Sequence, residues 1–364
     1  MITADQHWRW FTEFAEYELA TGGPDPHAKY VGILAQPCDW KERVWRGGLY
    51  SAVYTAPTAE AIWRAWPYQR VAESSQGALL EWLTTHWAGL PLRRERRAVR
   101  TPEKLARCLW SYHQWMEYQL VPYVENLHPD PYKAYESMWG FADKALYGFG
   151  RYALTKLLDF YEQYCDVPIR MGDIRPVGGW SPRLTLALLF PQAHLDARSN
   201  SPGNIADADL WALIGQERLR DEGLELDWFR YEVMLCEYRQ SVERERQYPG
   251  RSIDSELKYL QAVEHYWDAY AGSIDWSYRS DIWQVRQNIH PVECLGEYNG
   301  WDGPRDDLGG FLNASERTWS DQLWDYNAYR AGPVKEKEGG RDRIRDLART
   351  ALGKGAHEQS VAER

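Results

Sequence analysis

Residues 146–153 read Leu146-Tyr147-Gly148-Phe149-Gly150-Arg151-Tyr152-Ala153, and they separate two segments with helical periodicity, 134–145 and 154–164. Glycines in a short turn between helices leave backbone N–H groups accessible at the start of the second helix. Those groups, together with the positive end of the helix dipole, attract a phosphate. The stretch therefore predicts either a phosphate-binding turn or, with equal weight, a plain tight turn between two helices.

Helical periodicity also dominates the rest of the chain. Thr101-Pro102-Glu103 is typical of a helix start, and apolar residues then recur every three or four positions towards a predicted end near Pro122. Thr58 and Asp227 are predicted to cap two further helices. Residues 49–54 could form a short extended segment, but the alternating runs that a sheet needs are absent. The sequence therefore predicts an all-α fold.

Length and composition indicate a folded globular protein. The 364 residues are 44% hydrophobic and 26% charged, which excludes intrinsic disorder and a collagen-like repeat as the overall class. We expect one large helical domain over residues 1–331, with the turn near 134–164 inside it. From residue 332 onward the charged, glycine-broken sequence predicts a mobile C-terminal tail, 332–364.

Other features of the sequence indicate a reducing, aqueous compartment. The five cysteines include no Cys-x-x-Cys pair, and the start of the chain lacks the basic and apolar regions of a signal peptide. The longest aliphatic run, 184–190, is far shorter than the roughly 20 residues that span a bilayer. We therefore expect a cytoplasmic protein with no membrane partner.

The charge distribution points to a local contact with nucleic acid. A net charge of −10 disfavours non-specific binding to DNA, so any contact with DNA must be confined to one region of the surface. Between Pro91 and Arg107 the sequence has seven basic residues and two acidic ones. Such a strip, in which Arg94 and Arg97 are central, is typical of a surface that binds a DNA backbone. A solvated helix entrance is the alternative interpretation.

Several common catalytic motifs are missing from the sequence. It contains no His-Glu-x-x-His, no Walker loop, no Gly-x-Ser-x-Gly elbow and no Rossmann fingerprint. The nine histidines do not cluster at the spacing of metal ligands. Metal chemistry, nucleotide hydrolysis and serine esterase chemistry are therefore disfavoured.

The turn at 146–153 resembles a helix-hairpin-helix, the element by which DNA-repair glycosylases hold the sugar-phosphate backbone. This resemblance implies that Gly148, Gly150 and Arg151 bind a DNA phosphate. In those glycosylases a catalytic aspartate follows the second glycine at about the distance that separates Asp173 from Gly150 in this chain. Asp166 is a competing candidate, and Asp173 could instead be a helix cap or the partner of an arginine.

Three further clusters combine polar and aromatic residues. They are Arg46-Gly47-Gly48-Leu49-Tyr50 with 57–63, which contains Glu60; Glu237-Tyr238-Arg239-Gln240; and Tyr248-Pro249-Gly250-Arg251, followed by Asp254. Glu237 falls beside the apolar stripe of its predicted helix, so it could face a cleft. Arg239 and Arg251 could each fork onto a carboxylate or a pyrophosphate, although surface ion pairs explain them equally well.

At these clusters the chain resembles a phage family, the amino acid:DNA transferases, also called alpha-glutamyl/putrescinyl thymine pyrophosphorylases. The resemblance covers roughly residues 5–300. The family is similar to the helix-hairpin-helix glycosylases, so the resemblance implies a helical fold of that kind, in agreement with the turn at Gly148 and Gly150.

The resemblance implies a step of DNA hypermodification. The substrate would be double-stranded DNA in which 5-hydroxymethyluracil is pyrophosphorylated, and the co-substrate a free amino acid or polyamine. The amine would replace pyrophosphate at the 5-methylene carbon, and no metal or organic cofactor is required. A carboxylate must accept the amine proton, for which Asp173 and Glu237 are the candidates. The predicted substrate-binding residues are Arg46, Tyr50, Glu60, Arg239, Arg251 and Asp254.

Two other functions remain open from the sequence. One is a helix-hairpin-helix base-excision glycosylase, in which Asp173 would stabilise an oxocarbenium ion. The other is a helical DNA-binding accessory protein without catalytic activity. Products of a reaction on modified DNA would separate these two from the transferase.

Overall fold

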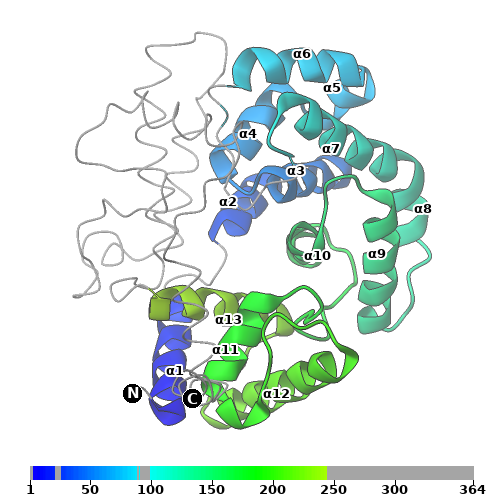
Figure 1. Cartoon of the computed structure of the whole chain (residues 1–364). Coiled ribbons are helices and arrows are strands. Elements are labelled where there is room, and N and C mark those ends of the chain that lie inside the picture. The colour runs from blue at the N-terminus through cyan, green and yellow to red at the C-terminus, as the bar shows by residue number, and fades with distance from the viewer. Residues whose placement is uncertain (1–2, 21–25, 88–89, 91–98, 244–364) are drawn as a thin grey trace, which may run out of the picture.

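The computed structural model describes residues 3–20, 26–87, 90 and 99–243, which form helices and the loops that connect them (Figure 1). No strand occurs among these residues, which confirms the predicted all-α class. The elements are α1 (Ala4–Ala20), α2 (Pro26–Ala35), α3 (Trp40–Val53), α4 (Ala56–Ala65), α5 (Tyr68–Ala72), α6 (Gln76–His86), α7 (Pro102–Trp115), the π-helical turn η3 (Met116–Leu120), α8 (Val121–Val124), α9 (Pro131–Ala145), α10 (Arg151–Tyr164), α11 (Trp180–Leu189), the 3-10 turn η4 (Pro191–Ala193), α12 (Pro202–Asp221) and α13 (Trp228–Glu243).

Side-chain caps start several of these helices as the sequence predicts. The hydroxyl of Thr101 accepts a hydrogen bond from the N–H of Lys104 at 3.3 Å, and Asp227 accepts one from the N–H of Arg230 at 2.7 Å. The cap predicted at Thr58 is wrong. The cap of α4 is Thr55, whose hydroxyl accepts a bond from the Thr58 N–H, so Thr58 lies in the first turn.

Two predicted helix limits also differ from the structure. The helix expected to end near Pro122 continues through η3 and α8 to Val124, because a proline in the first turn of a new helical segment needs no N–H. The extended segment considered at 49–54 is mostly the last part of α3, which Asp39 caps by accepting a bond from the Glu42 N–H at 2.9 Å. Its apolar side chains are buried on several faces by neighbouring helices, and this packing outweighs the local preference for a strand.

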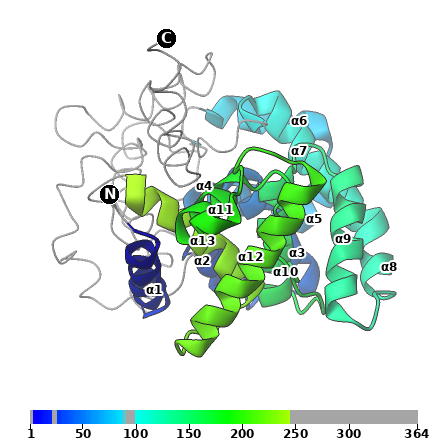
Figure 2. The ribbon, with the colours of Figure 1, turned by 60° about the horizontal axis from the view of Figure 1, so that its bottom comes forward.

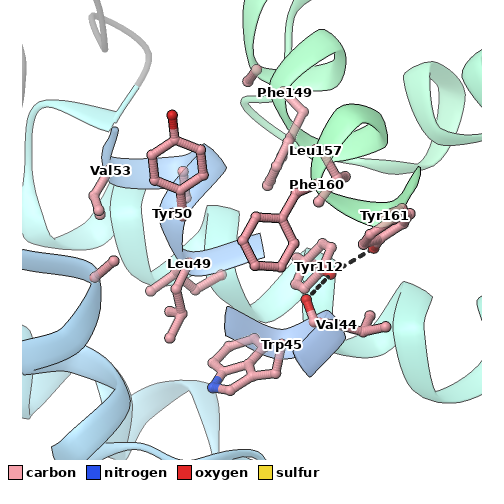
Figure 3. Close-up of a cluster of buried hydrophobic side chains, with 14 of the residues drawn as sticks. Val44, Trp45, Leu49, Tyr50, Val53, Tyr112, Phe149, Leu157, Phe160 and Tyr161 are labelled. Atoms are coloured by element: carbon pink, nitrogen blue, oxygen red, sulfur yellow. Dashed lines mark hydrogen bonds between the residues drawn. The ribbon is translucent and has the colours of Figure 1, made fainter. Parts of the chain in front are cut away.

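Most of the buried side chains belong to a first core formed mainly by α2 to α10, with Phe229 and Val233 of α13 packed into it. Figure 3 shows its centre, where Tyr112 of α7 donates a hydrogen bond to the carbonyl of Val44 at 2.6 Å and its hydroxyl lies 2.6 Å from that of Tyr161 of α10. Gly47 and Gly48 explain this close packing. A Cβ on Gly48 would overlap the Tyr112 ring, and one on Gly47 would lie 2.5 Å from the nearest atom of the Phe160 ring.

A second core joins the first helix to the last helices described. Helix α1 packs against α11 and α13, and Figures 1 and 2 show it beside them. Trp228, at the start of α13, packs against both cores. Because residues 244–331 lie outside the described residues, the single domain predicted over 1–331 stays a prediction, as does the tail 332–364.

Candidate active site

The predicted hairpin is a turn between α9 and α10. Gly148 has a φ of 79°, which favours glycine, and it packs against α7, where an added Cβ would lie 3.4 Å from the Sγ of Cys108. The Tyr147 N–H donates to the hydroxyl of Ser111, also on α7, at 3.1 Å. Gly150 is exposed, with open space around it, and no side chain caps α10 there. The first turn of α10 is therefore accessible to an anion.

Basic residues of α7 lie next to this turn. Arg107 is exposed, and its guanidinium carbon lies 4.0 Å from the centre of the Tyr147 ring; Lys104 is exposed one turn earlier on the same helix. The described end of the basic strip predicted from the sequence is thus beside the hairpin. Arg94 and Arg97, its two central arginines, lie outside the described residues.

Arg151 is directed into the protein. Its guanidinium donates to the carbonyls of Arg175 at 2.6 Å and Ile174 at 2.8 Å, and to the carboxylate of Glu232 on α13 at 2.8 Å. The Glu232 side chain is only 4% exposed. Arg151 was predicted from the sequence to bind a DNA phosphate. The structure shows it joining the hairpin to α13 and to the loop that carries Asp173.

Asp173 lies in this loop, between α10 and α11. Its Oδ1 accepts a hydrogen bond from the N–H of Arg175 at 2.6 Å, and the Nε of Arg175 is 3.9 Å away. The side chain of Asp173 is 40% exposed, so the carboxylate can be reached by a substrate. The competing candidate, Asp166, follows the other end of α10 and pairs with Arg43 at 2.8 Å.

Two residues near Asp173 were not predicted from the sequence. Asp209 of α12 has its pKa raised to about 6, because it is partly buried and faces the charge of Asp173, while Arg175 acts in the opposite direction. Tyr135 of α9 is 1% exposed, and burial raises the pKa of its hydroxyl. Both come from helices distant in sequence from Asp173, and a single Asp or Tyr on an amphipathic helix gives no signal of its own.

Glu237, the second candidate base, is half-buried on α13. On the same helix Glu232, and not Glu237, pairs with Arg151, and Glu232 also accepts a weak bond from the thiol of Cys236 at 3.6 Å. Glu232 was missed because it falls within an apolar stripe and resembles an ordinary helix residue. The side chain of Arg239, and the whole of Arg251 and Asp254, lie outside the described residues.

The first predicted substrate cluster is inside the protein. Arg46 and Glu60 form an ion pair whose side chains are 3% and 1% exposed, and the Arg46 guanidinium carbon lies 3.7 Å from the centre of the Trp63 ring. Arg46 also donates to the carbonyl of Leu34, so it joins α3 to α2 and α4. Tyr50 is buried in the first core. These three residues hold helices together in the structure, and their role in binding substrate stays a prediction.

Comparison with known families decides the class of protein. The model of the amino acid:DNA transferases matches residues 44–247, more than half of the chain. The chain belongs to the amino acid:DNA transferase family. No curated protein and no solved structure matches it.

This transferase is therefore an enzyme that uses DNA and an amino acid. The matched region contains the hairpin, Asp173, Asp209 and Glu237, whereas Arg251 and Asp254 lie beyond its end. The likeness to helix-hairpin-helix glycosylases stays a prediction. No helix among the described residues is long and apolar enough to cross a membrane.

Proposed function

We propose that this transferase hypermodifies thymine in phage double-stranded DNA, with pyrophosphorylated 5-hydroxymethyluracil as its substrate. The amine nitrogen of an amino acid attacks the 5-methylene carbon, a C–N bond forms, and the C–O bond to pyrophosphate breaks. Pyrophosphate leaves with the bonding electrons, and the proton of the amine passes to a carboxylate. The family supports transfer of an amino acid to DNA, and the following features of the chain support the finer assignment.

The face formed by the hairpin and the start of α7 suits a DNA backbone. Gly150 leaves open space before the first turn of α10, Arg107 adds exposed positive charge at the hairpin residue Tyr147, and Lys104 is exposed on the same helix as Arg107. In a chain with a net charge of −10, such a local basic surface is the footprint expected for phosphates.

Of the two candidate general bases, Asp173 is the one that the structure connects to this face. Arg151 follows Gly150 directly and binds the carbonyls of residues 174 and 175, so the base and the phosphate-binding turn are held in one rigid unit. This link between the hairpin and an accessible carboxylate is the observation that carries the proposal. Glu237 remains the second candidate base.

An exposed aromatic ring stands next to Asp173. Tyr132 of α9 is 46% exposed, and its ring is 3.3 Å from the position that a Cβ on Gly172 would take. A thymine that reacts at its 5-methylene carbon must leave the base stack, which costs a few kcal/mol. Stacking on Tyr132 can offset about 1–3 kcal/mol of that cost.

We assign the binding of the departing pyrophosphate to Arg239 and Arg251.

Release of pyrophosphate tests this function. DNA containing pyrophosphorylated 5-hydroxymethyluracil is incubated with the protein, with and without a mixture of amino acids, and pyrophosphate and abasic sites are both measured. We expect pyrophosphate to appear only when amino acids are present, and no abasic sites. Abasic sites in either reaction would indicate a glycosylase instead. Release that putrescine supports and amino acids do not would identify a polyamine as the co-substrate.

A further inference from the structure

Three buried polar atoms around Arg175 make no hydrogen bond of good geometry within the described part of the chain, although Tyr135 interacts with Arg175 and the Nε of Arg175 lies 3.9 Å from Asp173. They are the hydroxyl of Tyr135 on α9, the Nε of Arg175 in the loop after Gly172, and the Oδ1 of Asp209 on α12. Buried polar groups in folded proteins are nearly always hydrogen-bonded, so three such atoms with incomplete hydrogen bonding in one place favour a polar ligand there. The three elements that carry them are separate in sequence and meet at Arg175.

Arg175 is held as a rigid anion-binding group. Its guanidinium carbon lies 4.4 Å from the ring centre of Trp139 and 5.0 Å from that of Tyr135. Its two terminal nitrogens donate to the carboxylate of Glu136, one of them at 2.8 Å. The Glu136 side chain is 53% exposed, whereas that of Arg175 is 14% exposed. The planar guanidinium of Arg175 thus already binds one carboxylate. Because Glu136 is exposed, its side chain can move into solvent and leave the guanidinium free for another carboxylate.

Two further carboxylates, those of Asp173 and Asp209, lie near Arg175, which is the one cation that the described residues are shown to bring to both of them. Asp173 and Asp209 face each other's charge, and Arg175 is shared between them and Glu136. An ammonium placed between the two carboxylates would remove this repulsion and give the Oδ1 of Asp209 a donor. The cluster thus offers a cationic group for a carboxylate and, beside it, anionic groups for an ammonium.

We propose that this cluster binds the free α-amino acid, with its carboxylate on Arg175 in place of Glu136 and its ammonium between Asp173 and Asp209. The Tyr135 hydroxyl, which lies beside Arg175, bonds the same ligand. Asp173 then accepts the proton that the ammonium must lose before its nitrogen attacks DNA. The role that this site would have in the reaction rests on the proposed function. Binding of the free amino acid itself requires no DNA.

Calorimetric titration of the full-length protein with each common amino acid, without DNA, tests this site. We expect at least one amino acid to bind and putrescine, which has no carboxylate, to bind more weakly. Asp209→Asn and Arg175→Lys should each weaken binding by about 10-fold or more, the usual effect of losing a charged hydrogen bond. Glu136→Gln should strengthen it by about 2- to 5-fold, because a competing surface ion pair is removed.

A gain of affinity in Glu136→Gln cannot arise from misfolding, so this variant tests the site even if Arg175→Lys is unstable. Glu13→Gln, which removes an exposed ion pair with Arg9 on α1, is the control and should bind like the parent. Absence of amino acid binding, or unchanged affinity in the Glu136, Arg175 and Asp209 variants, would overturn the site. Binding without addition to DNA would instead refute the proposed function and leave the site intact.

Discussion

Arg151 and Glu232 form a largely buried ion pair, 2.8 Å long, between the start of α10 and the middle of α13. The same guanidinium binds the carbonyls of Ile174 and Arg175, so one side chain joins the hairpin, the Asp173 loop and α13. Removing one partner of such a pair leaves a buried charge without compensation.

Glu232→Gln should therefore lower the free energy of unfolding by about 3 kcal/mol, the lower end of the cost of breaking a buried pair. The exposed pair of Arg9 and Glu13, whose side chains are 66% and 64% exposed, provides a contrast. Glu13→Gln should cost less than about 1 kcal/mol. Urea denaturation of the two variants measures both values, and equal losses would show that the pair of Arg151 and Glu232 is no more important to stability than an exposed pair.

Helix packing at Gly48 can be tested with a matched glycine. Gly48→Ala places a methyl group into the Tyr112 ring, so we expect a loss of about 1–3 kcal/mol in the free energy of unfolding. Gly140, inside α9, has nothing within 4 Å of an added Cβ. Gly140→Ala should therefore stabilise the protein by about 0.5–1 kcal/mol through helix propensity alone. Thermal unfolding that ranks the two variants in the reverse order would contradict this packing.

The hairpin predicts a specific effect on DNA binding. Gly150→Val has space for its side chain, so the fold should be retained, but the valine would block approach of a phosphate to the first turn of α10. We expect weaker binding to duplex DNA at ~0.1 M salt, where phosphate contacts still contribute. Gly203→Val, on α12 and equally unobstructed, is the control. Equal affinity of both variants would remove the hairpin from the DNA interface.

The raised pKa of Asp209 predicts that the stability of the protein depends on pH. Its pKa is about 6 in the folded protein, above its ordinary value of 3.8. Between these values the folded state keeps a proton that the unfolded state has released, so stability falls as the pH rises from about 4 to about 6. Asp209→Asn removes this loss. It should be more stable than the parent at neutral pH, and the difference should shrink as the pH falls towards 4.

Denaturation of the parent and Asp209→Asn across this pH range measures the effect. Asp173 and Arg175 are the charged groups that face Asp209, so Asp173→Asn should reduce the shift. A variant that is more stable but binds its amino acid more weakly is the pattern expected of a residue kept for function. A difference in stability that is constant with pH would show that Asp209 has an ordinary pKa.

Local chemistry in the sequence predicts much of the helical fold. Caps such as Thr101 and Asp227 depend only on neighbouring residues, and both are confirmed. The segment at 49–54 was uncertain because two glycines precede it and its residues include strand formers. Its helical state depends on Tyr112 and Phe160, which pack against those glycines from α7 and α10. Contacts of this kind between distant segments leave no local pattern.

The residues of the candidate site likewise include some that local sequence indicates and others that only contacts between distant segments bring together. The hairpin glycines, and Asp173 through the resemblance to helix-hairpin-helix glycosylases, could be proposed from one short stretch of sequence, but Glu232 and Asp209 come to this region from α13 and α12. The sequence also placed Arg46 and Glu60 among substrate-binding residues because of their polar, aromatic neighbours. The structure buries this pair between helices, where such neighbours serve packing equally well.

Mass spectrometry of nucleosides detects transfer of an amino acid to DNA. Duplex DNA with pyrophosphorylated 5-hydroxymethyluracil is incubated with the full-length protein and a mixture of ¹⁵N-labelled amino acids, then digested. We predict a thymidine derivative that carries the label through a C–N bond at the 5-methylene carbon. Asp173→Asn should form it about 10²–10⁴ times more slowly, because the general base is removed, while still binding DNA. Nucleosides that remain unlabelled with the parent would exclude this reaction, and an equal rate in Asp173→Asn would exclude Asp173 as its general base.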